Sequence, residues 1–237
     1  MRKIILISGP SCVGKGPLLK ALKAFYPDVR TTEVPIIKSH ESRNHKPRAN
    51  ETAIWNNPSF FMPAADINNL DRRRFFVGDC RGYPQAIDLE KLKGAGADIV
   101  LLEVYHTIGA AFIKWALPLI KDIEVKTVFV SPLSKTEMAD LRAAGVDVSE
   151  YIKSIMIHKQ IVRARLLKKS FTSEAELNDI KARAADACVE MSSMDDYTDI
   201  IVNHDAEGHA NWTGGFEGRP EGDAARALCR LVDIIKK

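Results

Sequence analysis

The sequence lacks an apolar run that approaches the roughly 20 residues needed to cross a bilayer, so we expect no membrane-spanning segment. Only five apolar or small residues separate Lys3 from Gly9, which is too short for a signal peptide. The six histidines show no metal-ligand spacing, so no metal site can be assigned from them. The cysteines lie far apart without a CxxC pair, which argues against a disulfide framework and a structural zinc site and favours a reducing, cytoplasmic location; they are Cys12, Cys80, Cys188 and Cys229.

The composition is that of an ordinary globular protein. The chain has 237 residues, of which 46% are hydrophobic and 27% charged, and this balance excludes disordered, collagen-like and coiled-coil proteins. The net charge is +3, but residues 1–50 alone hold ten Lys or Arg and three Asp or Glu. Nucleic acid usually requires a broader basic surface, so this compact excess favours small phosphorylated ligands. We therefore expect no nucleic-acid partner.

Hydrophobic spacing predicts strands that alternate with helices, which favours an α/β fold with a parallel sheet covered on both faces. Residues 33–83 are rich in Asn, Pro, Arg and aromatic residues and predict an irregular inserted subdomain. Residues 207–222 hold five glycines and predict an exposed loop. Charged helical sequence runs over residues 135–194, with breaks near Gly145 and residues 170–173. The predicted strands are residues 4–8, 99–103, 125–130 and 200–202, and the other predicted helices are residues 18–25, 84–93, 107–120 and 223–235.

The segment from Gly9 to Lys15 fits the pattern G-x-x-x-x-G-K and lies between a predicted strand and a predicted helix. Glycines allow successive backbone N–H groups to turn inward around phosphate oxygens, and the N-terminus of the helix adds partial positive charge. Lys15 would reach the terminal phosphates of a nucleotide. A glycine-rich turn without a ligand is the alternative, and the flanking strand and helix argue against it.

The position after the lysine departs from this pattern. It normally holds Ser or Thr, whose hydroxyl helps to bind Mg²⁺, but here Gly16 is followed by Pro17. Proline is tolerated in the first turn of a helix, so the backbone cradle can persist. Magnesium would then need water, Ser11 or a remote carboxylate as a ligand. The sequence therefore supports phosphate binding more strongly than catalysis.

Residues 9–16 (Gly-Pro-Ser-x-x-Gly-Lys-Gly) resemble the loop of guanylate kinases, a family of nucleoside monophosphate kinases. Other segments follow in the family's order over nearly the whole chain. Ser39-His-Glu-Ser-Arg43 and Pro47-Arg48-x-x-Glu51 resemble the monophosphate-binding segment, with two extra residues between the arginines. Tyr83 resembles the second tyrosine of Y-Y-G-[ST], and residues 99–103 resemble the strand that ends in D-x-D, with Glu103 at the first acid and Tyr105 at the second. The family's C-terminal pattern matches Glu190-Met-Ser192, Tyr197 and Ile201-Val-Asn203-x-Asp205.

The resemblance implies ATP and Mg²⁺ as cofactors and nucleotide substrates as the partners of a monomer or homodimer. It also assigns ligand-binding roles to particular residues. ATP would be bound by Asn203 and by the loop residues Gly9, Pro10, Ser11, Cys12, Val13, Gly14, Lys15 and Gly16. The acceptor phosphate would be bound by Ser39, Arg43, Arg48 and Tyr83, since planar arginine forks suit a phosphate; solvated surface arginines are the alternative. The family's guanine-reading acid falls by spacing on Arg74, so Asp79 or Glu103 would replace it, and Glu103 could instead orient magnesium.

In the family, two arginines on a mobile helical segment lie over the transferring phosphate. Counting back from Glu190 places Arg183 at the second arginine and Lys169 at the first, which makes Lys15 and Arg183 the catalytic pair. An alternative alignment starts this lid at Leu141 and leaves Ala144 in place of one arginine. Arg163 and Arg165 are further candidates, unless they only pair with acids on exposed helix faces.

These patterns predict a three-layer P-loop NTPase fold in a single domain, residues 1–237. Its core would comprise residues 1–32, 84–134 and 195–237, its monophosphate-binding insertion residues 33–83, and its helical lid residues 135–194. The resemblance implies transfer of phosphate from ATP to a nucleoside monophosphate, with GMP as the family's acceptor. Two alternatives stay open. One is a kinase of a phosphorylated sugar such as ribose bisphosphate, and the other is a non-catalytic module that binds nucleotide or a phosphorylated partner.

Overall fold

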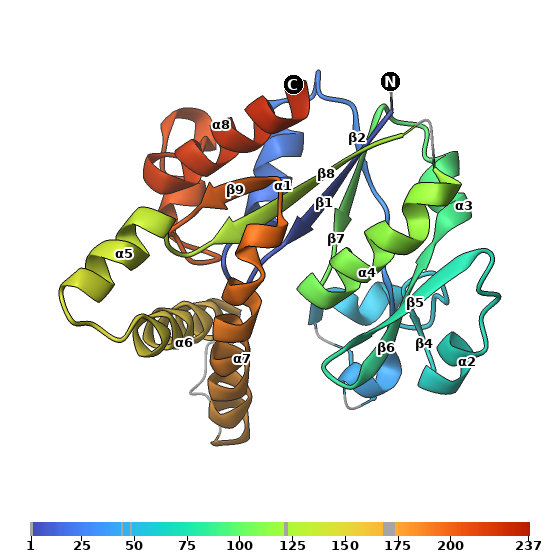
Figure 1. Cartoon of the computed structure of the whole chain (residues 1–237), viewed down its shortest axis with the longest axis horizontal. Coiled ribbons are helices and arrows are strands. Elements are labelled where there is room, and N and C mark those ends of the chain that lie inside the picture. Colours follow the sequence, from blue (N-terminus) through green and yellow to red (C-terminus); the bar gives the residue numbers. More distant parts are fainter. Residues whose placement is uncertain (1, 44, 48, 121–122, 168–173) are drawn as a thin grey trace. The chain divides into compact units, whose positions relative to one another are not determined.

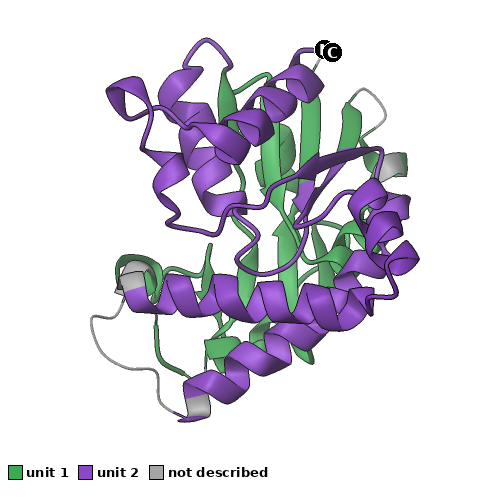
Figure 2. Cartoon of the chain, turned by 90° about the vertical axis from the view of Figure 1, so that its left-hand side faces the viewer, with its two compact units in different colours: residues 1–6, 30–126 green, residues 7–29, 127–237 purple. Residues whose placement is uncertain are grey.

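The computed structural model describes residues 2–43, 45–47, 49–120, 123–167 and 174–237. The chain divides into two compact units (Figure 2). The first unit contains residues 1–6 and 30–126, and the second unit contains residues 7–29 and 127–237. The predicted insertion falls wholly in the first unit and the predicted lid wholly in the second.

Five strands form a parallel sheet in the order β2-β7-β1-β8-β9, which confirms the predicted fold class (Figure 1). Ile4 to Ile7 are completely buried, as expected for a strand inside a covered parallel sheet. All four predicted strands are present, whereas the three-residue β2 is too short to be recognised by its spacing. The five strands are β1 (Lys3–Ser8), β2 (Thr31–Glu33), β7 (Ile99–Glu103), β8 (Glu124–Ser131) and β9 (Asp199–Val202).

The second unit contains five α-helices and three short 3-10 helices in its described residues, and the α-helices are labelled in Figure 1. Within it, α1 packs against α8, and α6 packs against α7. A capping box between Ser134 and Glu137 starts α5. The predicted break near Gly145 is confirmed, and this residue has a φ of 77°, but the break predicted at residues 170–173 lies outside the described residues. The helices are α1 (Lys15–Phe25), α5 (Lys135–Ala143), α6 (Val148–Leu167), α7 (Glu174–Ser192) and α8 (Gly222–Lys236).

The first unit contains a second sheet, so the prediction of an irregular insertion is wrong. Its four strands lie in the order β4-β3-β6-β5. Ile37, Ile67 and Ala86 form its buried core, against which partly buried apolar side chains pack. The strands are β3 (Ile37–Ser39), β4 (Phe61–Met62), β5 (Phe75–Cys80) and β6 (Tyr83–Asp88), and the helices of this unit are α2 (Ala64–Asn68), α3 (Leu89–Gly94) and α4 (His106–Ala116).

The helix predicted for residues 84–93 is wrong in its first half, because Tyr83–Asp88 is strand β6. Arg81 and Gly82 have φ values of 57° and 81° and form the two-residue turn of a β5–β6 hairpin. Pro84 is the second residue of β6, where it pairs with β5 but is outside the described register with β3. Helix α3 begins only after Asp88, whose carboxylate accepts the first amides of the helix.

In an open α/β sheet, ligands bind outside the carboxyl ends of the strands. In the second unit, β1 ends at Ser8 and β9 ends at Val202, so the glycine loop and Asn203 each follow such an end. Two segments that the sequence analysis singled out, the glycine loop and Asn203, therefore lie at the carboxyl ends of strands, where ligands bind in this class of fold. Over the described ranges, no helix has both the length and the apolar character required to span a membrane.

Candidate functional site

The glycine loop, residues 9–16, requires glycine at two positions. Gly9 and Gly14 have φ values of 132° and 105°, which L side chains rarely adopt. A Cβ atom at Gly9 would lie 2.2 Å from the main-chain oxygen of Val130, and a Cβ atom at Gly14 would lie 2.3 Å from Nδ2 of Asn203. The bend leads directly into the N-terminus of α1. A tight glycine bend before a helix N-terminus is an anion-binding arrangement.

Lys15 adds a buried positive charge to this loop. Its side chain is only 7% exposed, and its Nζ atom donates to the main-chain oxygens of Gly9 at 2.5 Å and Pro10 at 3.0 Å. The ammonium group and the positive end of α1 therefore act on the same short segment. A Cβ atom at Gly16 would meet nothing within 4 Å, so packing does not prevent a larger residue there. The loop can thus bind an anion, although Gly16 offers no hydroxyl group for a metal ion.

Asn203 connects the end of β9 to the glycine loop. Its side chain is fully buried, and its Nδ2 atom donates to the main-chain oxygens of Val13 at 2.7 Å and Asp205 at 2.9 Å. Its Oδ1 atom accepts the amide of Asp205 at 3.2 Å. The Trp212 ring would also contact a Cβ atom at Gly14, at 3.1 Å. Asn203 and Trp212 therefore fill the space that a side chain at Gly14 would need.

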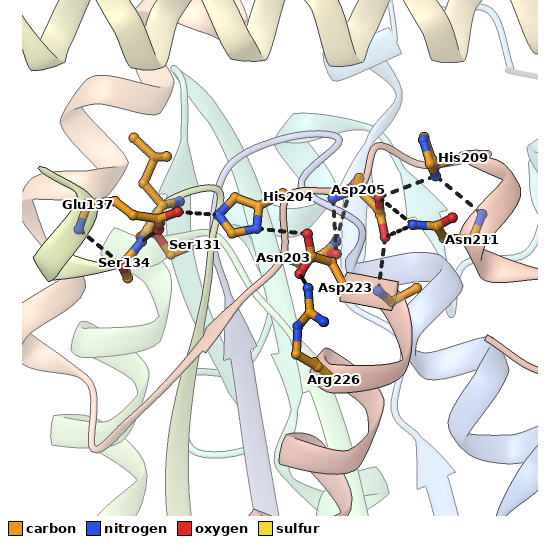
Figure 3. Close-up of polar contacts among 12 residues, drawn as sticks. Ser131, Ser134, Glu137, Asn203, His204, Asp205, His209, Asn211, Asp223 and Arg226 are labelled. Atoms are coloured by element: carbon orange, nitrogen blue, oxygen red, sulfur yellow. Dashed lines mark hydrogen bonds and ion pairs between the residues drawn. The ribbon is translucent and has the colours of Figure 1, made fainter. Parts of the chain in front are cut away.

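The segment after Asn203 is held by the buried carboxylate of Asp205 (Figure 3). This group accepts from Nδ2 of Asn211 at 3.1 and 3.2 Å and from the amide of Ala224, in the first turn of α8, at 2.9 Å. Trp212 is buried and donates from Nε1 to the oxygen of Ala206. The prediction of an exposed loop at residues 207–222 is therefore wrong at Trp212, although it agrees with Phe216, which is 83% exposed.

His204 links two helices beside this segment (Figure 3). Its Nε2 atom lies 2.8 Å from Glu137 of α5, and its Nδ1 atom lies 2.9 Å from Asp223 of α8. Burial would raise the pKa of Glu137, but the Ser134 amide and His204 hold that pKa below its ordinary value. The pKa of Asp223 is also lowered, since Arg226 and His204 outweigh the effect of burial. These contacts connect the residue after Asn203 to both α5 and α8.

Helix α6 directs two cations to the same region. Lys159 is 2% exposed, and its Nζ atom donates to the main-chain oxygens of Asn203 at 2.9 Å and Asp205 at 3.2 Å. Arg163, one turn later, donates to the Sγ atom of Cys12 at 3.6 Å and pairs with Glu207 at 2.7 Å. Burial lowers the pKa of Lys159 to about 8, although Asp205, Asp223 and Cys12 act in the opposite direction.

In the first unit, two of the predicted acceptor residues lie in one turn. Ser39, at the end of β3, is fully buried, and its Oγ atom accepts the amide of Ser42 at 3.2 Å. Arg43 donates to the carboxylate of Glu51 from Nε at 3.1 Å and from Nη2 at 3.0 Å. Its guanidinium carbon lies 6.0 Å from the centre of the Phe61 ring. The geometry of Arg43 is thus set by a carboxylate, the group whose shape most resembles a phosphate edge. Arg48 lies outside the described residues.

The remaining acceptor candidates lie at the β5–β6 hairpin and at the end of β7. Asp79 accepts the amide of Gly82 at 2.8 Å and so closes the hairpin turn, while Tyr83 is partly exposed at the start of β6. The pairing of Lys38 with Gln85 places Ser39 and Tyr83 at the same end of the four-stranded sheet. Glu103 ends β7 in the other sheet and is exposed.

Arg74 occupies the place at which the resemblance expects a guanine-reading acid. Its guanidinium group donates to both oxygens of Asp88, at 3.1 and 2.7 Å. Asp88 is almost fully buried and also caps α3. Burial would raise the pKa of Asp88, but Arg74 and the amides of Lys91 and Glu90 lower it overall. Arg74 therefore forms a structural ion pair with Asp88, and this position offers no carboxylate that could bind a guanine base.

Comparisons with known proteins show the family to which the chain belongs. No family model matches the chain. A curated guanylate kinase from Prochlorococcus marinus subsp. pastoris is 31% identical over 159 residues, which cover 64% of this chain and 77% of the relative. The chain belongs to the guanylate kinase family.

A crystal structure of guanylate kinase from Anaplasma phagocytophilum matches 99% of this chain and 85% of its own, with a TM-score of 0.52 and 15% identity. At this identity the match shows the fold alone, which is the P-loop NTPase fold of guanylate kinases. A fungal RNA kinase structure matches with a TM-score of 0.42 and 10% identity, which is too low to support an argument.

The lid arginines of a guanylate kinase have several candidates in this chain. Arg183 lies on α7 and pairs with Asp179, one turn earlier, at 2.8 Å. Lys169 lies outside the described residues, and Arg165 is exposed on α6. Arg163 pairs with Glu207 of the segment after β9 and contacts the glycine loop, so it does more than pair along an exposed helix face.

The sequence analysis assigns no role to Lys159, although this residue is buried in the structure. It follows Ile152 and Met156 at helical spacing, and all three side chains are buried. A lysine on the apolar stripe of an amphipathic helix is a recognisable signal, because a buried ammonium group requires polar partners. Its partners are two main-chain oxygens more than 40 positions away in the sequence. The spacing of apolar residues on the helix does not identify them.

A magnesium site built from several protein ligands does not fit these residues. In the described part of the chain, no group of three or more His, Cys, Asp or Glu side chains could hold a metal ion. Gly16 replaces the usual hydroxyl ligand, and the Oγ atom of Ser11 lies 3.9 Å from Sγ of Cys12. The glycine loop, by contrast, fits phosphate, because the positive φ values of Gly9 and Gly14 shape a bend at which the Lys15 ammonium group and the N-terminus of α1 supply positive charge.

Proposed function

We propose that the protein transfers the γ-phosphoryl group of ATP to a nucleoside monophosphate, with GMP as the first acceptor to test. The glycine loop carries this proposal. Gly9 and Gly14 have no room for side chains, and the buried ammonium group of Lys15 lies against the loop at the start of α1. Membership in the guanylate kinase family supports the class of reaction.

On the donor side, the amides of the glycine loop and Lys15 would bind the ATP phosphates. Magnesium would accompany ATP, with ligands from phosphate oxygens and water. Arg183 would neutralise the charge that develops on the transferring group. In phosphoryl transfer the protein usually forms no covalent bond to the substrate. The rate acceleration would therefore come from positioning of the reactants and electrostatic stabilisation of the transition state.

On the acceptor side, Ser39, Arg43, Arg48 and Tyr83 would bind the monophosphate. Arg43 already holds a carboxylate at 3.0 to 3.1 Å, and a phosphate would replace part of this contact with Glu51. Glu103, with or without Asp79, would contact the acceptor base.

A second acceptor class is a phosphorylated sugar. The Arg74–Asp88 ion pair supports this alternative, because it leaves no carboxylate at the place where the family reads guanine. Such an acceptor would need the phosphate-binding residues without a base-reading acid. The donor site would be unchanged.

A non-catalytic module that binds nucleotide or a phosphorylated partner is the third candidate. Gly16 supports it, because the loop lacks the hydroxyl that normally binds magnesium. The retained Lys15 argues against it, since a scaffold without nucleotide has no need for a buried ammonium group at the loop.

A coupled assay of ADP release distinguishes the three candidates. The protein is incubated with ATP, magnesium and, in turn, each of a panel of nucleoside monophosphates and sugar phosphates. Turnover that depends on GMP or another monophosphate supports the proposal, and turnover only with a sugar phosphate supports the second candidate. Measurable ATP binding without turnover with any acceptor supports the module. Absence of ATP binding would refute the donor site itself.

A further inference from the structure

The buried ammonium group of Lys159 contacts neither substrate in the proposed reaction. It is 2% exposed, on a stripe of α6 that also buries Ile152 and Met156. A buried charge must be paired or fully hydrogen-bonded to be tolerated. Lys159 donates to two main-chain oxygens, those of Asn203 and Asp205, and so holds the chain directly after β9 from one side.

Asn203 continues this contact to the glycine loop. Its main-chain oxygen accepts from Lys159, while its side-chain amide donates to the main-chain oxygen of Val13 at 2.7 Å. A shift of the main chain at Asn203 would therefore move or break the contact with Val13. One residue thus connects the ammonium group to the backbone of the loop.

Gly14 leaves little room for such a shift. The Nδ2 atom of Asn203 lies 2.3 Å from the position of a Cβ atom at Gly14, and the Trp212 ring lies 3.1 Å from it. Packed interiors have few voids, so neighbouring groups move together or clash. Asp205 is fixed independently to Asn211 and to the amide of Ala224 in α8. The segment 203–205 is therefore anchored by α6 at its oxygens and by α8 at a carboxylate.

We propose that Lys159 is a positioning residue for the donor site. It holds the main chain at Asn203 and Asp205, so that the Asn203 amide keeps Val13 and Gly14 in the conformation that binds ATP phosphates. Lys159 acts through Asn203 and does not contact the nucleotide. This inference rests on the proposed function of the glycine loop as the ATP site.

The test compares Lys159→Met with Lys159→Gln in the full chain. Met removes both hydrogen bonds and the charge, whereas Gln removes the charge and keeps N–H donors on a side chain one methylene shorter, so it cannot restore both hydrogen bonds in full. Lys153→Met is the matched control, because Lys153 lies on the same helix, is 37% exposed and pairs with Glu150. Binding of MgATP is measured by calorimetry, KM values are measured separately for ATP and for the acceptor, and thermal melting monitors the fold.

We expect Lys159→Met to weaken MgATP binding by about 10- to 100-fold, the scale of losing one hydrogen bond between the loop and a charged phosphate. The KM for ATP should rise by the same factor, while the KM for the acceptor stays unchanged. Lys159→Gln should recover part of the affinity, and Lys153→Met should match the wild type. A purely structural role would instead lower the active fraction and leave both KM values unchanged.

Equal MgATP affinity of folded Lys159→Met and the wild type would overturn the inference. If Lys159→Met fails to fold, Lys159→Gln decides, and wild-type affinity in that variant would overturn it as well. Failure of the proposed reaction is recognised separately, because the wild-type protein would then bind MgATP without turnover, and the affinities would still test the role of Lys159. If the wild-type protein does not bind MgATP, the donor site is refuted and the inference falls with it.

Discussion

The substitution Gly14→Ala tests whether the glycine loop is the donor site. Gly14 has a φ of 105°, and a Cβ atom there would lie 2.3 Å from Nδ2 of Asn203, where an ordinary contact begins near 3.4 Å. Asn203 cannot easily move away, because the same Nδ2 atom donates to Val13 and Asp205. The loop backbone must therefore shift by about 1 Å to accept a methyl group.

Two separate losses are expected from this substitution. Forcing an L side chain into a sparsely populated backbone conformation costs about 1–3 kcal/mol. In a protein of this size, that cost corresponds to a fall in melting temperature of about 2–12 °C. A shift of the loop backbone also breaks hydrogen bonds from its amides to the phosphates, and a hydrogen bond to a charged group is worth about 1.5–3 kcal/mol. We therefore expect MgATP binding to weaken by about 100-fold, well beyond what the loss of stability explains.

The measurement is calorimetric titration with MgATP, together with thermal melting and ADP release. Gly16→Ala is the matched control, because a Cβ atom there meets nothing within 4 Å. It should leave both the affinity and the melting temperature near the wild-type values. If Gly14→Ala lowers the melting temperature but binds MgATP as tightly as Gly16→Ala does, the glycine loop is not the phosphate site and the reasoning is refuted.

Three further predictions concern the same unit. Lys15→Ala should lower turnover by at least about 100-fold in the ADP-release assay, the scale of losing a transition-state charge contact, and unchanged turnover would mean that the loop is not the donor site. Gly16→Ser should raise turnover at limiting magnesium, because it restores the missing hydroxyl in open space, and a magnesium titration that matches the wild type would contradict this. The pKa of Lys159 falls from 10.5 to about 8, so the unfolded chain holds more protons between these values. The free energy of unfolding should therefore rise with pH over that range by up to about 3 kcal/mol relative to Lys159→Met, which urea titrations at several pH values would detect.

The parts of the fold that the sequence predicts are those fixed by local signals. The run Ile4 to Ile7 is uniformly apolar, and it is followed at once by Gly9, Gly14 and an amphipathic helix. Each of these features depends on neighbours within a few positions, and the structure reproduces them as β1, the glycine loop and α1. The same holds for the break after α5, where Gly145 supplies a positive φ.

The second sheet could not be predicted from local signals, because its strands are stabilised by pairing between distant segments. Pro84 followed by an alternating segment resembles a helix start as much as a strand. Strand β6 is stabilised by pairing with β3, more than 40 positions earlier, and with β5 across a turn at Arg81 and Gly82. Asp88 then starts α3 as a cap and also pairs with Arg74. Long-range pairing therefore decides the structure of this segment, and its residues alone leave helix and strand equally open.

The donor site illustrates the same limit from the opposite direction. The sequence singles out Asn203 through the family's C-terminal pattern, but the pattern does not reveal that the Asn203 amide donates to Val13. It also gives no reason to connect Lys159 with either residue. These contacts arise because Asn203 follows β9 directly and lies against the glycine loop, while α6 brings Lys159 to the same segment, which is a property of the folded unit. Under our proposal, the glycine loop therefore depends on Lys159, which belongs to no motif, because a family pattern identifies groups expected to meet the ligand and not the groups expected to hold them in place.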